Sequence, residues 1–203
     1  MKFEYLNNPC KTSSLPFYKR NISFPKNVCV FHMSDYNENN NYRRVDKYFK
    51  LKHDLRDIRK TSIEAFPIEI KEDINDLVDM INESYEKEGI IISRDYFNDL
   101  SKSTLYRKNL WLKIVDSDKN MIASLIALYD GEINEGVVDF IQVLPKYRGL
   151  GYARELLLKV LNELRSVADF VTVSGRVENQ TNPKKLYESV GFTGDDIWYV
   201  CIK

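Results

Sequence analysis

The sequence predicts a mixed α/β domain with a mostly antiparallel sheet, and three observations lead to this fold class. Apolar runs with the composition and length of strands repeat through the second half of the chain. Two long amphipathic stretches have the apolar spacing of helices. Short polar turns join three consecutive strand-like runs, which is typical of an antiparallel meander.

The chain has 203 residues, enough for one domain with a sizeable core or for one domain with an appendage. Lys and Arg number 30 and are matched by 30 Asp and Glu, which argues against a general attraction to nucleic acid or anionic lipid. The three cysteines show neither CxxC pairing nor metal-ligand spacing, so we expect a reducing compartment and no metal. We recognise neither a leader nor a membrane span and expect a cytoplasmic protein.

Residues 1–60 form an extension whose role is not legible in the sequence. Residues 27–36 resemble a strand, and the frequent aromatic residues favour an ordered segment over a disordered tail. Residues 47–60 interleave basic and aromatic side chains, which keeps an interaction or nucleic-acid-binding domain open as an alternative. Acidic residues follow at once, however, and favour a solvated surface segment.

The more regular part of the chain begins near residue 61. Pro67 places its first strand at an edge or a bulge, and Gly89 suits the stop of its first helix. Ser93 is a good N-cap for a second helix, and Asp116–Asn120 is a polar turn between two strands. The predicted elements are strand 63–70, helix 72–89, helix 93–106, two strands within 109–130, strand 136–144, a helix after residue 151, strand 168–178, a helix within 182–192 and strand 197–203.

The helix after residue 151 has one apolar face opposite a charged one. The apolar residues recur three and four positions apart and are Leu156, Leu157, Val160, Leu161, Leu164 and Val167. We interpret this stripe as part of the core. Its burial would fix the helix axis and, with it, the position of the helix N-terminus.

A turn with two glycines, residues 148–153, joins the strand 136–144 to this helix. The first N–H groups of a helix lack intrahelical partners, and this end carries a partial positive charge. Small residues would let an anion approach these groups, and Arg148 would add donors suited to phosphate oxygens. The turn matches neither the phosphate loop of nucleotide hydrolases nor the dinucleotide fingerprint. A purely structural turn is the alternative.

Two motifs in the chain resemble those of the GNAT superfamily of N-acyltransferases. Arg148-x-x-Gly151-x-Ala153 matches the acyl-CoA pyrophosphate loop [RQ]xxGx[GA], and the phrase NPKKLYESVGF resembles the later motif LYxxxGF. The resemblance implies the N-acetyltransferase fold, in which helices flank a mixed, mostly antiparallel sheet with two splayed central parallel strands, here 137–144 and 169–177. We therefore divide the chain into an N-terminal extension, 1–60, and an N-acetyltransferase domain, 61–203.

The resemblance also implies roles for individual residues. The pyrophosphate would be bound by Arg148, Gly149, Leu150, Gly151, Tyr152 and Ala153, and the pantetheine arm by backbone groups of Val143 and Leu144. Tyr187 would protonate the leaving thiolate, and a core aromatic is the alternative role for it. An amide within 179–182 would contact the cofactor. The family's usual Asn position holds Gln180 here, and Asn182 before Pro183 fits a helix N-cap as well.

The sequence offers two candidates for the general base. Val137, Asp139, Ile141 and Val143 share one strand face by their period of two, and Asp139 is the only titratable residue among them. Its position matches one where some relatives carry an acid or a histidine, while a salt bridge or a solvent-facing side chain is the alternative. Glu135 is the second candidate.

Together the motifs predict an N-acetyltransferase that moves an acetyl group from acetyl-CoA, as co-substrate, to an amine by direct transfer. A small-molecule amine and a peptide amine both stay open as acceptors, and we expect neither nucleic acid nor a membrane as a partner. The aromatic run Trp198–Val200 leaves a homodimer open. The alternative is a non-catalytic acyl-CoA-binding or sensor module whose extension, 1–60, fills the acceptor cleft.

Overall fold

The computed structural model describes residues 2–14 and 24–203. They form two compact units, and each unit is described by itself. The central unit comprises residues 54–171. The terminal unit combines residues 1–53 with residues 172–203, so both ends of the chain belong to the same unit.

The elements follow the order that the sequence predicts from residue 63 onward, and three described elements precede them. The central unit contains β3 (Phe66–Pro67), α3 (Ile70–Ser84), the 3₁₀ turn η1 (Glu86–Glu88), α4 (Arg94–Ser101), η2 (Lys108–Leu110), β4 (Trp111–Val115), β5 (Met121–Asp130), β6 (Glu135–Val143), η3 (Pro145–Tyr147), α5 (Tyr152–Leu164) and the start of β7 (Phe170–Arg176). The terminal unit contains α1 (Lys2–Asn7), β1 (Val28–His32), β2 (Arg44–His53), the rest of β7, α6 (Pro183–Glu188) and β8 (Thr193–Ile202).

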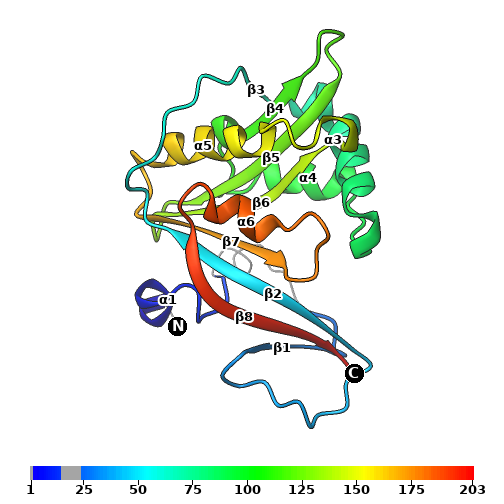
Figure 1. Cartoon of the computed structure of the whole chain (residues 1–203), viewed down its shortest axis with the longest axis vertical. Helices are drawn as coiled ribbons and strands as arrows, with labels where there is room; N and C mark the ends of the chain where they lie inside the picture. Colours follow the sequence, from blue (N-terminus) through cyan, green and yellow to red (C-terminus); the bar gives the residue numbers. More distant parts are fainter. Residues whose placement is uncertain (1, 15–23) are drawn as a thin grey trace. The chain divides into compact units, whose positions relative to one another are not determined.

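In the central unit, β3, β4, β5 and β6 pair in that order, and each pair is antiparallel (Figure 1). The start of β7 lies beside the start of β6. The Asp169 N–H donates to the Asn134 carbonyl at 2.8 Å. A Cβ on Gly136 would stand 3.0 Å from a methyl carbon of Val171. From the first contact to the second, both segments advance by two residues, from Asn134 to Gly136 and from Asp169 to Val171. The two strands therefore start in parallel. The predicted mixed α/β fold with a mostly antiparallel sheet is confirmed.

Helices cover both faces of the central sheet. Leu125 and Ile126 follow each other on β5 and are both fully buried, although successive strand residues point to opposite faces. On one face, the Ser124 hydroxyl lies 3.5 Å from the Met80 sulfur of α3. On the other face, a Cβ on Gly136 would meet Leu164 of α5 at 2.6 Å. The sheet is thus a middle layer with α3 on one side and α5 on the other.

The apolar stripe of α5 forms part of this core, with one correction. The buried residues of α5 are Leu156, Leu157, Leu158, Val160, Leu161 and Leu164. Val167, which the sequence placed on the same stripe, lies beyond the end of the helix and is 50% exposed. The helix ends at Leu164, whose carbonyl accepts from the Val167 and Ala168 N–H groups, and this turn carries the Val167 side chain away from the stripe.

In the terminal unit, β8 lies between β1 and β2 and is antiparallel to both (Figure 1). The prediction of a surface segment at 47–60 was wrong for its first part, because β2 takes residues 47–53 into the sheet. Phe49 and Leu51 are buried there. Lys50 is buried too, and its ammonium donates to the Thr12 carbonyl at 2.9 Å. This hydrogen bond supplies the partner that a buried charge needs.

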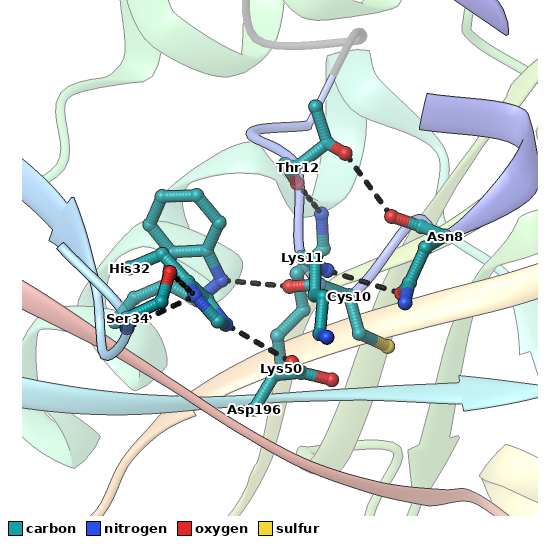
Figure 2. A network of polar contacts seen from close by, with 9 residues as sticks. Asn8, Cys10, Lys11, Thr12, His32, Ser34, Lys50 and Asp196 are labelled. Atoms are coloured by element: carbon teal, nitrogen blue, oxygen red, sulfur yellow. Dashed lines mark hydrogen bonds and ion pairs between the residues drawn. The ribbon is translucent and has the colours of Figure 1, made fainter. Parts of the chain in front are cut away.

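The N-terminal segment contributes to the core of the terminal unit (Figure 2). The Tyr5 ring is fully buried and lies 4.8 Å from the Lys50 ammonium. The Trp198 Nε1–H of β8 donates to the Cys10 carbonyl at 2.8 Å. His32 of β1 bonds through Nε2 to Asp196 of β8 at 3.0 Å. These contacts join residues from both ends of the chain in one network.

Within the described residues, no helix combines the length and the apolar character that crossing a bilayer requires. The same residues hold no cluster of three or more His, Cys, Asp or Glu side chains that could ligate a metal ion. The three cysteines are free thiols.

Candidate active site

Strand β6 carries a β-bulge at Asp139. Phe140 pairs with Ile126 of β5, and Val138 pairs with the next β5 residue, Ala127, so Asp139 is the extra residue between them. A bulge of this kind locally bends a strand and re-aims a side chain, and bulges are frequent beside active sites. It divides β6 into two segments, and residues an even number of positions apart across the bulge point to opposite faces of the sheet.

The bulge overturns the prediction that Val137, Asp139, Ile141 and Val143 share one face. Val137 pairs with Leu128 and Ile141 pairs with Leu125, and these partners are three residues apart on β5. Directly paired residues share a face and the faces alternate, so Val137 points to the face opposite to Ile141 and Val143. The period of two holds within each segment and is interrupted at the bulge.

The Asp139 side chain is half-buried and lies beside α4. The Tyr96 hydroxyl of α4 donates to Asp139 Oδ2 at 3.2 Å. The bulge therefore brings the one titratable candidate of this part of β6 to the side of the sheet that α3 and α4 cover. The second candidate base, Glu135, is fully buried at the opposite end of β6. It lies eight residues before Val143, roughly 26 Å along an extended strand.

Beyond the bulge, the backbone of β6 alternates between its two edges. The Leu144 N–H donates to the Ile122 carbonyl of β5 at 3.0 Å, so this group faces β5. By alternation, the backbone groups of Val143 and Ile141 point away from β5. Side chains bind their two carbonyls: Arg148 Nε donates to Val143 at 3.0 Å, and the Tyr85 hydroxyl donates to Ile141 at 3.1 Å. Of the two residues that the sequence assigned to the pantetheine arm, Val143 is the one with its backbone on this edge.

The loop after β6 is anchored to the β4–β5 turn. The Tyr147 hydroxyl of η3 donates to Asp116 Oδ2 at 3.2 Å. The Asn120 backbone N–H also donates to Asp116 and is the main reason that the pKa of this carboxyl lies below its ordinary value. A carboxylate that stays ionised is a strong acceptor for both donors, and it fixes the residue immediately before Arg148.

The start of α5 has the conformation that an anion cradle needs. Gly149 and Gly151 have φ angles of 80° and 87°, in the left-handed region that glycine adopts without strain. A Cβ at either position would meet nothing within 4 Å, so the space beside both glycines is open. Gly151 is the N-cap, and no side chain caps the helix from that position. The first N–H groups of α5, at Tyr152 and Ala153, therefore begin a helix next to open space.

The side chains around the helix start are exposed or half-exposed. Arg148 and Leu150 are exposed, and Tyr152 and Ala153 are half-buried. The hydrogen bond to Val143 uses only Nε of Arg148, so the two terminal amino groups of its guanidinium lie outside that bond. A guanidinium, two left-handed glycines and a helix N-terminus thus lie within one short loop, and groups of these kinds are the ones that suit phosphate oxygens.

Glu155, the acidic residue in the first turn of α5, has cationic and hydroxyl partners of its own. Arg59 Nη2 donates to Oε1 at 2.8 Å, and the Thr61 hydroxyl donates to Oε2 at 2.6 Å. The segment that follows β2 thus runs along α5 and compensates the charge of this carboxylate. This compensation reduces the repulsion that Glu155 would exert on an anion at the helix start.

Tyr187 lies on α6 in the terminal unit and is 5% exposed. Its ring makes edge contacts with Phe49 at 6.0 Å and with Phe192 at 5.7 Å. The packing agrees with a core aromatic, and it also holds the ring in one orientation. Both roles that the sequence left open for Tyr187 are compatible with this position.

Asn182 occupies the N-cap position of α6, but its side chain does not cap the helix. Its φ of 48° is left-handed, whereas a capping side chain needs an extended backbone. The predicted side-chain cap is therefore wrong. Instead, Asn179 Oδ1 accepts from the N–H and the hydroxyl of Thr181, at 2.9 and 2.6 Å. The side chain of Asn182 is not required for the start of α6.

The family model described as "Acetyltransferase (GNAT) domain" matches residues 81–196. The chain therefore belongs to the GNAT acetyltransferase family. A comparison with curated protein sequences finds no match.

Solved structures share the fold at low sequence identity. A GCN5-related N-acetyltransferase from Sphaerobacter thermophilus is 19% identical, with a TM-score of 0.64 over 80% of this chain and 52% of that one. A GNAT-family acetyltransferase from Novosphingobium aromaticivorans is 16% identical, with a TM-score of 0.61 over 89% of this chain and 68% of the other. A chain of the NatC complex bound to Gag peptide and CoA is 19% identical, with a TM-score of 0.57 over 68% of this chain and 96% of that one. The chain thus spans about half the length of the Sphaerobacter protein.

Proposed function

We propose that this protein is an N-acetyltransferase that moves an acetyl group from acetyl-CoA to an amine by direct transfer. The observation that carries the proposal is the loop between β6 and α5, where Gly149 and Gly151 adopt left-handed conformations beside open space. Membership of the GNAT family supports it, and one solved structure of similar fold holds CoA.

In this proposal the start of α5 binds the paired phosphates of the co-substrate. The N–H groups of Tyr152 and Ala153 donate to phosphate oxygens, and the helix dipole favours the negative charge there. Gly149, Leu150 and Gly151 supply the loop that passes close to the phosphates. Arg148 adds charged donors, which are about twice as strong as neutral ones.

Val143 positions the thioester in the same proposal. Its N–H and C=O groups lie on the edge of β6 that points away from β5, whereas the Leu144 N–H is bonded to Ile122. The pantetheine arm pairs with this edge like an added strand. The Val143 N–H donates to the thioester oxygen and stabilises the oxyanion that forms when the amine attacks.

Two side chains handle the protons. The amine nitrogen attacks the thioester carbonyl carbon, and the carbon–sulfur bond breaks. Asp139 accepts the proton that the amine loses, directly or through a water, and Tyr187 donates a proton to the leaving thiolate. Asn182 contributes its amide to the co-substrate, since α6 does not use that side chain as a cap.

A calorimetric titration with acetyl-CoA tests the binding half of the proposal. We expect wild type to bind and Arg148→Ala to bind about tenfold or more weakly, because charge-assisted hydrogen bonds are lost. Arg56→Ala is the matched control: Arg56 is 83% exposed and pairs with Asp54 on the surface. An absence of binding to wild type at millimolar acetyl-CoA would end the proposal.

A second candidate function is acyl-CoA binding without catalysis. The near-complete burial of Tyr187 among Phe49 and Phe192 favours it, because a core tyrosine needs no catalytic role. A coupled assay for released thiol across a broad panel of amines separates the two functions. Acetyl-dependent thiol release with any amine selects the enzyme. Binding of acetyl-CoA without release across the panel selects the binding module.

A further inference from the structure

A serine, a histidine and an aspartate form a hydrogen-bonded row in the terminal unit (Figure 2). His32 is the last residue of β1, and Ser34 follows in the turn that leaves this strand. Asp196 lies on β8, which pairs with β1. The Ser34 hydroxyl lies 2.8 Å from His32 Nδ1, and His32 Nε2 lies 3.0 Å from Asp196 Oδ1. The two ring nitrogens of one imidazole thus join a hydroxyl to a carboxylate.

The pairing of β1 with β8 brings the three side chains together. His32 stands opposite Trp198 in the antiparallel register, so Asp196, two residues before Trp198, is its diagonal neighbour on the same face. After His32 the chain turns, and the Tyr36 N–H donates to the His32 carbonyl at 3.1 Å. This turn returns the Ser34 side chain to the imidazole.

The backbone fixes the position of the proton on the imidazole. The Ser34 backbone N–H donates to His32 Nδ1 at 3.3 Å, and an N–H can only donate, so Nδ1 presents a lone pair. A neutral imidazole then has its proton on Nε2, which donates to Asp196. The Ser34 hydroxyl therefore donates to Nδ1. In this arrangement a histidine can take the proton of a hydroxyl nucleophile while a carboxylate orients the ring.

The base of this row is enclosed, and its hydroxyl is accessible. His32 is 5% exposed and the Asp196 side chain is 14% exposed, whereas Ser34 lies at the surface. The Trp198 ring packs edge-on against the imidazole at 5.3 Å and is itself held by its hydrogen bond to the Cys10 carbonyl. Water screens an enclosed pair less than an exposed one, so the carboxylate attracts an imidazolium strongly here.

We propose that Ser34 is a nucleophilic serine that takes acyl groups from small activated esters. Its oxygen attacks the carbonyl carbon of the ester, and its proton passes to His32 Nδ1. The bond to the leaving alcohol breaks, the alcohol takes the proton from Nδ1, and the acyl group stays on Ser34. Water then hydrolyses the serine ester through the same imidazole and releases a carboxylic acid. Asp196 is a positioning residue, because it acts on the ester only through His32.

The proton transfer also provides a donor for the developing oxyanion. Once Nδ1 is protonated it no longer accepts, so the Ser34 N–H loses this acceptor when the ester oxygen gains negative charge. An exposed serine suits small esters with good leaving groups, since these need little binding. The site goes beyond the proposed function, because its three residues belong to the terminal unit and its reaction needs neither acetyl-CoA nor an amine.

A fluorophosphonate locates the nucleophile, because its adduct with serine is stable. The Ser34 oxygen attacks phosphorus, fluoride leaves, and the proton passes to His32. Peptide mass spectrometry of the full chain, without acetyl-CoA, gives the labelling rate of each serine. We expect Ser34 to be labelled about 100-fold or more faster than Ser62, an exposed serine of the central unit, since general-base assistance contributes this much.

4-Nitrophenyl acetate tests the transfer of an acyl group. We expect wild type to show a phase of 4-nitrophenolate release that Ser34→Ala lacks. Because Ser34 is exposed, this variant removes the nucleophile without opening a cavity in the core. Ser62→Ala is the matched control and should keep the phase.

Substitutions at His32 and Asp196 test the two neighbours of Ser34. His32→Gln should slow phosphonate labelling about 100-fold or more, whereas His53→Gln, at the chain's second buried histidine, should leave it within about threefold of wild type. Asp196→Asn keeps the shape of the side chain and loses its charge, while Asp196→Glu keeps the charge and changes the shape. We expect Asp196→Glu to label faster, because an imidazolium needs the carboxylate. A merely structural role of Asp196 predicts the reverse order.

Four results would each overturn the inference: labelling of Ser34 no faster than that of Ser62, equal labelling in wild type and His32→Gln, faster labelling in Asp196→Asn than in Asp196→Glu, or phenolate release unchanged in Ser34→Ala. Should His32→Gln fail to fold, the comparison of Ser34 with Ser62 in wild type still decides. The acetyl-CoA titration is a separate measurement, so the ester site and the proposed function stand or fall independently.

Discussion

Replacing Gly151 by alanine gives the most direct test of the loop that opens α5. Gly151 has a φ of 87°, and a Cβ at this position would meet nothing within 4 Å. The substitution therefore adds backbone strain without a steric clash inside the protein. The new methyl group would also occupy the space in which phosphate oxygens approach the first N–H groups of α5.

The expected magnitudes follow from these two effects. A left-handed conformation costs an L-residue roughly 1–2 kcal/mol, which corresponds to a fall in Tm of about 2–8 °C for a chain of this size. Separating the phosphates from the helix start removes charge-assisted hydrogen bonds worth about 1.5–3 kcal/mol. The affinity for CoA should then fall about tenfold to 150-fold.

Gly89→Ala is the matched control for Gly151→Ala. Gly89 also has a left-handed φ, 69°, and a Cβ there would likewise meet nothing within 4 Å. It ends η1, away from the loop in the sequence. Thermal unfolding of both variants should show similar losses of stability, and calorimetric titration with CoA should show a loss of affinity in Gly151→Ala alone.

The reasoning is refuted if Gly151→Ala loses stability to the same extent as Gly89→Ala and still binds CoA within about threefold of wild type. In that case the left-handed glycine serves only the turn between β6 and α5. The open space beside it would then have no part in binding phosphate.

Three further substitutions test other parts of the molecule. Tyr187→Phe keeps the ring contacts and should lower kcat about 100-fold in steady-state kinetics with acetyl-CoA affinity unchanged; equal turnover removes Tyr187 from catalysis. Gly175→Ala places a Cβ in steric overlap with the Phe49 ring, so urea unfolding should show a loss of about 1–3 kcal/mol that a smaller residue at Phe49 restores. The lowered pKa of Asp116 means that its stabilising effect is present above pH 3.8 and is lost as the pH falls below it. Thermal unfolding of Asp116→Asn should therefore depend less on pH in that acid range than wild type does, and an identical pH dependence would contradict this assignment.

Most elements could be predicted because their signals are local. Helix α3 (Ile70–Ser84), predicted at 72–89, and the stripe of α5 follow from apolar spacing, and Ser93 caps α4 as its residue type suggests. Strand β2 was missed because basic residues interrupt its apolar pattern. Inside it, the ammonium of Lys50 donates to the Thr12 carbonyl, 38 residues earlier, and lies over the Tyr5 ring. A partner that distant in the sequence leaves no local pattern.

The candidate site also has a part that the sequence predicts and a part that depends on tertiary packing. The residue types at 148–153 indicate the loop directly, and their backbone angles agree with it. The hydroxyl of Tyr85 meets the Ile141 carbonyl across 56 residues, and that of Tyr96 meets Asp139 across 43. The spacing of each tyrosine within its own helix predicts only packing. Their contacts with β6 depend on how α3 and α4 lie on the sheet, which no short stretch of sequence specifies.

The bulge at Asp139 decides what this carboxylate can do. With regular alternation, Asp139 would share a face with Ile141 and Val143, the face that α5 covers with leucine side chains. An ionised carboxylate there would lose its hydration without gaining a charged partner, at a cost of several kcal/mol. The extra residue places it instead beside the Tyr96 hydroxyl, half-buried, while Ile141 and Val143 still face α5 and keep the edge of β6 in register with β5. One inserted residue thus separates the two requirements of the proposed reaction: an apolar anchor for the strand that holds the thioester, and a polar, accessible position for the group that meets the amine.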